Sequence, residues 1–450
     1  MKKLNRFEIA LTGIILMHVL VLLKGFFFPY PELFVYPYLT NIGLMPYVQI
    51  LDQHFPGLMF FPINLANIGF VTPDHFRVLQ IGTIIALHIL IYKIGFSLTD
   101  SKKTALLGNI LYFIIHPFLE GNVVWIDNFI PLLLLPAFYF LAEKKRIFWA
   151  GLLLGLAILL KQVVIPTSIL IFLWLWFTDK KLTRSFFLGI AIPVTILVFY
   201  IFSKGLLNDF IYWTYTFNIS TFAQMGRKYP TFRQLLAMGV LYFPAILVSL
   251  YGFISRKREL SLLSLMLFGS LLFAYARFDY VHLQPSLPFA ILAIVYFFGR
   301  ISEKVSKNLF ILYLLPLVWL TTRFYMTSIG DKVNFFGSTE YNVADKIIEL
   351  TDPGDPIFMY GTLPHMYQMT STRPSGNIFV FHFPWFMKIA EDKVLNGLQS
   401  DPPRVVVQQK SASIDDYYLY DYMQKIEKYV SENYEKIEEV EGVEILVPKR

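Results

Sequence analysis

One apolar stretch, from about residue 147 to residue 177, constrains the fold of this chain more than any other segment, because Lys161 lies near its middle. Basic residues border the stretch on both sides: Lys144, Lys145 and Arg146 before it, and Lys180, Lys181 and Arg184 after it. Since short basic loops favour the cytoplasm, both ends are expected on that side, with the stretch forming a membrane hairpin. Each arm has about 14 to 16 residues, or roughly 21 to 24 Å of helix, which is shorter than the roughly 30 Å hydrocarbon core. Lys161 is therefore expected at a recessed tip, where a cation needs an anionic partner such as a lipid phosphate.

The composition predicts a polytopic membrane protein. Of the 450 residues, 56% are hydrophobic and 16% are charged, and the mean hydropathy is +0.53. About eleven transmembrane helices are expected, near residues 7–28, 76–96, 104–119, 126–142, 147–160, 162–177, 185–203, 235–254, 260–275, 285–299 and 308–326. The net charge of +7 does not indicate nucleic acid, because the basic residues cluster in short loops between spans. The absence of cysteine excludes disulfides and thiolate metal sites.

Two domains are expected. Residues 1–327 would form an all-α transmembrane domain whose first outer loop covers 29–75, and residues 328–450 a small α/β domain. With the amino terminus in the cytoplasm, every basic cluster lies on the cytoplasmic side of the cell membrane, and an odd number of spans makes the carboxyl-terminal domain extracytoplasmic. In that domain the patterns predict helices at 342–350 and 416–434 and strands at 356–360, 404–407 and 443–447.

Two acids in the first outer loop are candidate catalytic bases. Glu32 directly follows the first span, and Asp52 lies in the string Leu51-Asp-Gln-His-Phe-Pro-Gly57, together with His54. A carboxylate at the membrane boundary can take a proton from an acceptor hydroxyl. The structural alternative is that Glu32 is an exposed acid and that Asp52 and His54 organise a turn.

The later outer loops supply candidate anion ligands. Asp127 opens the fourth span, where it either caps the helix or belongs to the site. Arg277 and His282, in Tyr275-Ala-Arg-Phe-Asp-Tyr-Val-His282, can both donate to phosphate oxygens, although a lone Arg at this position is usually an interfacial anchor. Acids early in the chain and cations late in it predict one site with acidic and anion-binding walls. His18 and His88 are expected to be interior or interfacial polar groups.

Several motifs are absent from the sequence. It contains no Gly-rich P-loop, no HExxH and no carboxylate pair at metal-ligand spacing, so no cofactor is predicted and nothing argues for a metal.

Four strings in the same order and on the same face resemble the GT-C superfamily of integral membrane glycosyltransferases. They are "PYVQILDQHFPG" after an early outer acid, "WIDN", "GLLLGLAILLKQ" and "ARFDYVHLQPSLPF". The similarity is greatest to the family 39 type, which includes protein O-mannosyltransferases and the lipid A aminoarabinose transferase, and it covers about residues 1–330.

The resemblance implies transfer of a sugar, with inversion, from a polyprenyl-phosphate donor to an extracytoplasmic glycan, lipid or protein acceptor. It implies that Glu32 is the catalytic base and that Asp52 and His54 lie in a turn similar to the family's "DQHPPG" turn. Asp127 would be the second acidic position, and Lys161, Arg277 and His282 would bind the lipid phosphate. The chain departs from the pattern at Pro31-Glu32, where the family commonly has aspartate, so Asp52 stays open as the alternative base.

Two other functions remain open from the sequence. A transporter or flippase of lipid-linked solutes would also place cations at the membrane boundary, but it predicts ionisable residues at the midplane and related halves. A catalytically silent binder of lipid-linked sugars would result if the altered first acid had removed catalysis.

Overall fold

The computed structural model describes residues 5–330 and 332–450, which form two compact units. The helical unit consists of the described residues in 1–28, 76–198 and 228–332. The mixed unit consists of residues 29–75, 199–227 and 333–450. The mixed unit therefore combines the predicted first outer loop with nearly all of residues 328–450, instead of beginning at a single boundary.

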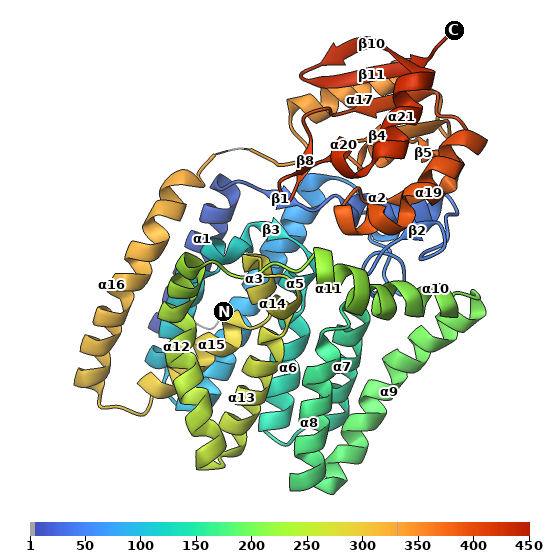
Figure 1. Cartoon of the computed structure of the whole chain (residues 1–450). Helices are drawn as coiled ribbons and strands as arrows, with labels where there is room; N and C mark the ends of the chain where they lie inside the picture. Colours follow the sequence, from blue (N-terminus) through green and yellow to red (C-terminus); the bar gives the residue numbers. More distant parts are fainter. Residues whose placement is uncertain (1–4, 331) are drawn as a thin grey trace. The chain divides into compact units, whose positions relative to one another are not determined.

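Each predicted span coincides with a helix or with two consecutive helices (Figure 1). They are α1 (Arg6–Lys24), α3 (Pro73–Thr99), α4 (Lys102–Ile115), α5 (Ile126–Phe129) with α6 (Pro131–Ala142), α7 (Ile147–Leu160), α8 (Val164–Thr178), α9 (Lys180–Ser203), α12 (Phe232–Ser255), α13 (Arg258–Leu271) with α14 (Phe273–Ala276), α15 (Leu287–Phe298) and α16 (Glu303–Thr327). Within the described ranges, six helices are long and apolar enough to cross a membrane, and several are shorter apolar helices. The expectation of a helical polytopic protein is confirmed.

The predicted hairpin is present in the helical unit. Helix α7 ends at Leu160, Lys161 is extended (φ −156°, ψ 125°), and α8 begins at Val164. Gly151 of α7 faces Gly189 of α9 so closely that a β-carbon on either would clash with the other helix's backbone. Small residues of this kind let helix backbones approach each other in apolar surroundings. The first arm of the hairpin is thus packed closely against α9.

Three buried histidines connect α1, α3 and the end of α4. His18 Nδ1 lies 2.9 Å from His88 Nε2, and His18 Nε2 lies 3.2 Å from His116 Nδ1. The Asn109 amide donates to Ala105 O, which leaves Asn109 Oδ1 to accept a hydrogen bond from His88 Nδ1 at 2.8 Å. His88 Nε2 is then an acceptor, so each ring of the chain donates one hydrogen bond to the next. His18 and His88 are interior polar groups, as expected.

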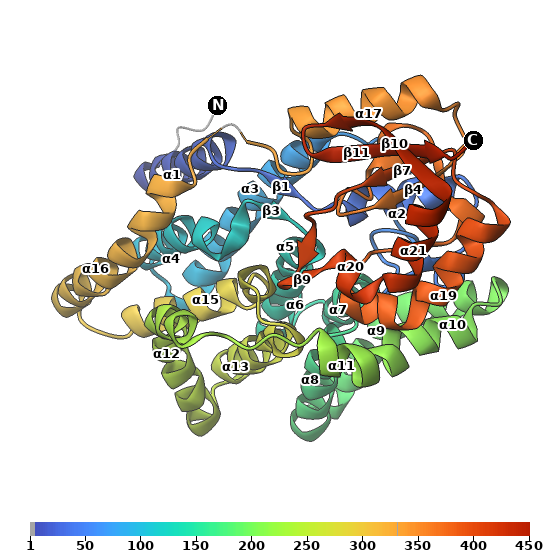
Figure 2. The ribbon, with the colours of Figure 1, turned by 45° about the horizontal axis from the view of Figure 1, so that its top comes forward.

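The mixed unit contains a five-stranded sheet in the order β10-β11-β7-β4-β5. Its strands are β4 (Pro356–Tyr360), β5 (Arg373–Pro374), β7 (Val405–Gln408), β10 (Tyr434–Val440) and β11 (Val443–Pro448). Strand β4 is parallel to β5 and β7, whereas β11 is antiparallel to β7 and β10. Helix α17 (Ser338–Leu350) lies on one side of the sheet, and α19 (Pro384–Ser400) and α21 (Gln424–Asn433) on the other (Figures 1 and 2). The predicted strands and the helix at 342–350 are confirmed within a few residues.

The single helix predicted for residues 416–434 is wrong. Strand β9 (Tyr417–Tyr418) pairs with β8 (Ser413–Ile414), and a short α20 (Leu419–Tyr422) precedes α21. Tyr434 already begins β10, because the edge of the sheet offers it a backbone partner at Pro448. Tertiary pairing therefore overrides the local helical pattern at both ends.

Long-range pairing ties the first outer loop into the mixed unit. Strand β2 (Ile50–Leu51) is parallel to β6 (Phe379–Val380). The Tyr38 hydroxyl, on α2 (Glu32–Asn41), donates to Thr372 O. The unit is completed by short helical segments: η1 (Ala66–Ile68), α10 (Leu207–Ile211), η3 (Tyr212–Thr216), η4 (Asn218–Phe222), α11 (Ala223–Met225), α18 (Met366–Met369) and η6 (Ser375–Asn377).

Candidate functional site

Three of the predicted site residues meet in the helical unit, and we call them the ion-pair cluster: Asp127, Lys161 and His282. Lys161 Nζ lies 2.5 Å from Asp127 Oδ2, and His282 Nδ1 lies 3.2 Å from Asp127 Oδ1. Lys161 Nζ is also 3.5 Å from His282 Nδ1. The cluster is shielded, since Lys161 is 6% exposed and Asp127 is 0% exposed. A buried lysine at the hairpin tip thus has its anionic partner within the chain.

Asp127 does not cap its helix. Helix α5 begins at Ile126 after Trp125, with no side-chain hydrogen bond at its start, and the Asp127 carboxylate instead accepts from Lys161. An ammonium group has three N–H donors, so the contact with Asp127 leaves Lys161 able to bind a further anion. The His282 Nδ1 atom can donate to Asp127 or accept from Lys161, but not both. Asp127 therefore fixes the orientation of both basic side chains.

Arg277 forms an ion pair with an acid of its own segment, Asp279. Its Nε donates to Asp279 Oδ2 at 2.9 Å, and Lys228 approaches Asp279 at 4.0 Å. Glu120 contacts the same segment, because its Oε2 accepts a hydrogen bond from Val281 N at 2.9 Å. Burial raises the pKa of Glu120 to about 7. Because Val281 directly precedes His282, Glu120 holds the segment that carries the histidine.

Asn128, beside Asp127 in α5, is a polar residue whose role in the site the sequence did not reveal. Its side chain is buried, and neither Oδ1 nor Nδ2 has a hydrogen-bond partner among the residues that the structure describes. A buried amide without partners is costly. The string Trp-Ile-Asp-Asn marked this position as polar, but helix capping explained the polar residues as well as membership of a site did.

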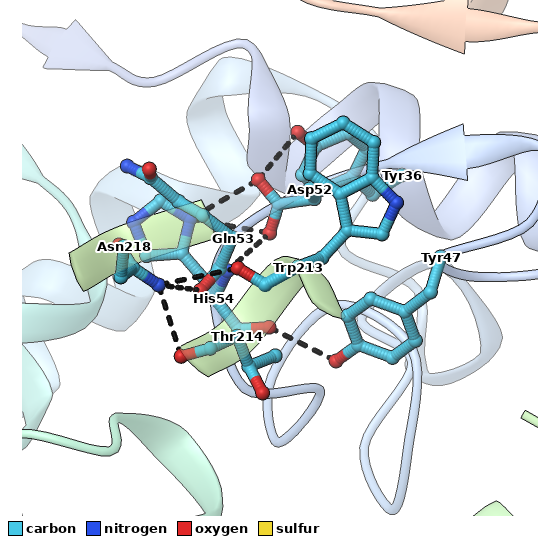
Figure 3. A network of polar contacts seen from close by, with 8 residues as sticks. All are labelled: Tyr36, Tyr47, Asp52, Gln53, His54, Trp213, Thr214 and Asn218. Carbon is cyan, nitrogen blue, oxygen red and sulfur yellow. Dashed lines mark hydrogen bonds and ion pairs between the residues drawn. The ribbon is translucent and has the colours of Figure 1, made fainter. Parts of the chain in front are cut away.

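In the mixed unit, Asp52 is enclosed by hydrogen bonds (Figure 3). The Tyr36 hydroxyl donates to Asp52 Oδ1 at 2.9 Å, and the His54 backbone N–H donates to Asp52 Oδ2 at 2.9 Å. His54 Nδ1 lies 3.1 Å from Asp52 Oδ1. Burial acts to raise the pKa of Asp52, but the His54 ring and these hydrogen bonds outweigh it and lower the pKa. Asp52 and His54 thus organise a turn, which was the structural alternative to a catalytic role for Asp52.

The turn is supported from the segment after α10. The Asn218 amide donates to Gln53 O at 3.2 Å and to Trp213 O and Thr214 O, and the Tyr47 hydroxyl donates to His54 O (Figure 3). The backbone on both sides of Asp52 is therefore fixed by side chains, and the carboxylate cannot move without breaking several contacts.

Glu32 has a different environment in the same unit. It is the first residue of α2, is 9% exposed and lines a cavity of about 230 Å³. Its Oε2 atom is buried and has no hydrogen-bond partner within the described ranges. Burial raises the pKa of Glu32 to about 7. Of the two candidate bases, Glu32 is the one that lines a cavity and has a carboxylate oxygen without a partner among the described residues.

The predicted site residues thus divide between the units. Glu32, Asp52 and His54 belong to the mixed unit, and Asp127, Lys161, Arg277 and His282 to the helical unit. In residues 5–330 and 332–450, no group of three or more His, Asp or Glu side chains is arranged to hold a metal ion.

Comparison with known proteins identifies the fold. No protein-family model matches the chain, and no curated protein matches its sequence. ArnT from Cupriavidus metallidurans, bound to undecaprenyl phosphate, matches with a TM-score of 0.62 and 11% identity over 97% of both chains. The Archaeoglobus fulgidus oligosaccharyltransferase, tethered to an acceptor peptide, matches with a TM-score of 0.56 and 12% identity over 95% of this chain and 72% of that one. The chain shares its fold with these two structures, as the resemblance found in the sequence led us to expect.

Proposed function

We propose that this protein is an integral membrane glycosyltransferase that moves a sugar from a polyprenyl-phosphate donor to an extracytoplasmic acceptor hydroxyl. The observation that carries the proposal is the buried Glu32 carboxylate, which has an unpartnered oxygen at a cavity. The GT-C fold supports the donor class, because ArnT, of the same fold, was determined with undecaprenyl phosphate.

The ion-pair cluster binds the lipid phosphate in this proposal. Lys161 donates to phosphate oxygens, the protonated His282 ring donates to them from Nε2 while its Nδ1 donates to Asp127, and Asp127 holds both side chains in place. Negative charge on the phosphate grows as its bond to the sugar breaks, so donors aimed at it in a shielded site stabilise the transition state. Asn128 supplies a further neutral donor at the same end of α5, and Arg277 attracts the headgroup from its pair with Asp279.

Glu32 is the proposed catalytic base. It takes the proton from the acceptor hydroxyl while the oxygen attacks the anomeric carbon from the side opposite the phosphate, which inverts that centre. A pKa of about 7 leaves a large fraction of Glu32 ionised at neutral pH, as this step requires. Asp52 is then a positioning residue, because its oxygens already accept from Tyr36 and His54.

The proposal includes the topology predicted from the sequence. About eleven spans cross the cell membrane, the amino terminus is cytoplasmic, and residues 328–450 are extracytoplasmic. The acceptor is a glycan, lipid or protein that carries a hydroxyl on that side.

One observation favours a transporter of lipid-linked sugars as the second candidate. The chain of His18, His88 and His116 places ionisable groups inside the helical unit, and intramembrane ionisable groups often mark transport pathways. A transporter would move donor across the bilayer without cleaving it.

The test is transfer by purified protein in lipid, with a panel of radiolabelled polyprenyl-phosphate sugars and Lys161→Ala beside the wild type. Release of polyprenyl phosphate that is lost in the variant supports the enzyme. Movement of intact donor between leaflets, with no release for any sugar, supports the transporter instead.

A further inference from the structure

The cavity in front of Glu32 is walled mainly by aromatic rings. It lies within the mixed unit and is formed by the start of α2 and by segments of the carboxyl-terminal sheet. The rings that line it include those of Phe335, Phe358, Tyr367, Phe379, Phe381 and Phe383. Several of these rings pack against one another, for example Phe379 and Phe381 with their centroids 5.4 Å apart and their planes at 88°. The walls are therefore held in shape by ring packing.

Few polar groups in this cavity are available to a ligand. Glu32 Oε2 and His382 Nδ1 are buried and have no partner in the part of the chain that the structure describes. The Thr362 hydroxyl already donates to Gln409. A sugar ring carries several hydroxyls, and the apolar rings that make up most of the walls offer them no partner in exchange for the water they would lose. The cavity is therefore suited to an apolar body with one hydroxyl.

We propose that the cavity binds the aromatic ring of the acceptor, and that the hydroxyl which receives the sugar is phenolic. The inference rests on the proposed function. In the transfer step the phenolic O–H proton passes to Glu32 Oε2, the phenolic oxygen bonds to the anomeric carbon, and the bond from that carbon to the lipid phosphate breaks. The phosphate leaves with the bonding electrons, and the His382 Nδ1 atom is a second polar contact beside the ring.

Two physical arguments favour a phenol over an aliphatic alcohol. Aromatic rings pair with one another at an angle or with an offset, so walls made of rings hold a flat aromatic guest better than a flexible chain. A phenol has an ordinary pKa near 10, so it gives up its proton to Glu32, with its pKa of about 7, more readily than an aliphatic alcohol does.

The first experiment measures binding of small probes to the full-length protein in nanodiscs by calorimetry, with protein-free nanodiscs as the blank. The probes are N-acetyltyrosinamide, 4-methylphenol, N-acetylserinamide and methyl glucoside. We expect the two phenols to bind at least tenfold more tightly than the other two. Tighter binding of the tyrosine amide identifies a peptide as the source of the ring, and equal binding identifies a free phenol.

Variants test the location. Ile378→Trp fills the cavity and should weaken phenol binding at least tenfold, whereas Ile348→Trp, on the exposed face of α17, should leave it unchanged. If Ile378→Trp does not fold, Phe381→Leu removes one wall and should weaken the same probes. Tighter binding of methyl glucoside or of the serine amide, or phenol binding that both cavity variants retain, would overturn the inference.

The two proposals fail in different ways. Lys161-dependent release of polyprenyl phosphate with the serine amide or methyl glucoside as acceptor, but not with a phenol, removes this inference and keeps the glycosyltransferase. Cavity-dependent phenol binding without any release of lipid phosphate keeps the ligand chemistry and removes the glycosyltransferase.

Discussion

The two units differ in how they treat a buried carboxylate: Asp127 in the helical unit has a partner on each oxygen, whereas Glu32 in the mixed unit has an oxygen without a partner among the described residues. In the helical unit, the carboxylate of Asp127 is fully engaged, with Lys161 on one oxygen and His282 on the other. In the mixed unit, Glu32 lines a cavity, and its buried Oε2 atom has no partner among the described residues. The contacts of Asp127 fix the geometry of its partners, whereas Glu32 keeps a carboxylate oxygen available to a ligand.

The same contrast separates the two acids of the first outer loop. Asp52 accepts hydrogen bonds from Tyr36 and His54, and its pKa is lowered, whereas burial raises the pKa of Glu32 to about 7. A general base works best when its pKa lies near the operating pH. The comparison assigns proton transfer to Glu32 and positioning to Asp52, and each prediction below tests one side of it.

The largest effect is expected for Glu32→Gln, which keeps the shape of the side chain and removes the base. Loss of general-base catalysis should slow transfer by roughly 10² to 10⁴-fold. Donor binding should be unchanged, and equilibrium binding of the lipid donor checks this. Glu444→Gln is the matched control, because Glu444 is also a buried acid of the mixed unit but pairs with Lys410, away from the site residues. Equal losses in both variants would contradict the assignment.

Breaking the ion-pair cluster should lower stability. Asp127→Asn alone leaves Lys161 buried without its counter-charge, and the free energy of unfolding should fall by about 3 to 5 kcal/mol. The double variant Asp127→Asn, Lys161→Met removes both charges and should recover much of that loss. Denaturant unfolding in detergent measures the stabilities, and donor binding should remain weak in the double variant. Recovered donor binding would show that the cluster is only structural.

Asp52→Asn should have an intermediate effect. It replaces one acceptor oxygen by a donor beside Tyr36 and His54, and hydrogen bonds to a charged group are each worth about 1.5 to 3 kcal/mol. Stability should fall while the pH dependence of transfer stays the same. If the fall in the transfer rate at low pH shifted or disappeared in this variant, Asp52 would be the base.

The pH dependence of the wild type should follow Glu32. Below pH 7 the carboxyl group is protonated and cannot accept a proton, so transfer should slow about tenfold for each pH unit below about 7 and level off above it. Asp52, with its lowered pKa, would give no limb in this range. Single-turnover rates between pH 5 and pH 9 measure the profile.

The smallest effect is expected for Arg277→Gln. Arg277 and Asp279 are only part-buried, and ion pairs of this kind contribute about 1 kcal/mol or less. The free energy of unfolding should therefore fall by no more than this amount, and the affinity for the donor should fall only modestly. A loss as large as that of Lys161→Ala would place Arg277 in direct contact with the phosphate.

The sequence predicted the parts of this molecule that local pattern controls. Long apolar runs between basic loops become helices, and the hairpin around Lys161 follows from charge placement alone. The cavity beside Glu32 could not be predicted, because it depends on parallel pairing between residues 50–51 and 379–380, more than 300 positions apart. The pairing of Lys161 with Asp127 likewise required the fold, and the sequence could only mark both as candidates.

The most direct test follows binding and release in one single-turnover experiment with a radiolabelled polyprenyl-phosphate sugar. The wild type should bind donor and release polyprenyl phosphate when acceptor is added. Glu32→Gln should bind the donor as well as the wild type does, but it should release polyprenyl phosphate at a rate lower by at least 10²-fold. Lys161→Met should bind the donor weakly. Release by Glu32→Gln at the wild-type rate would contradict the central claim that Glu32 is the base.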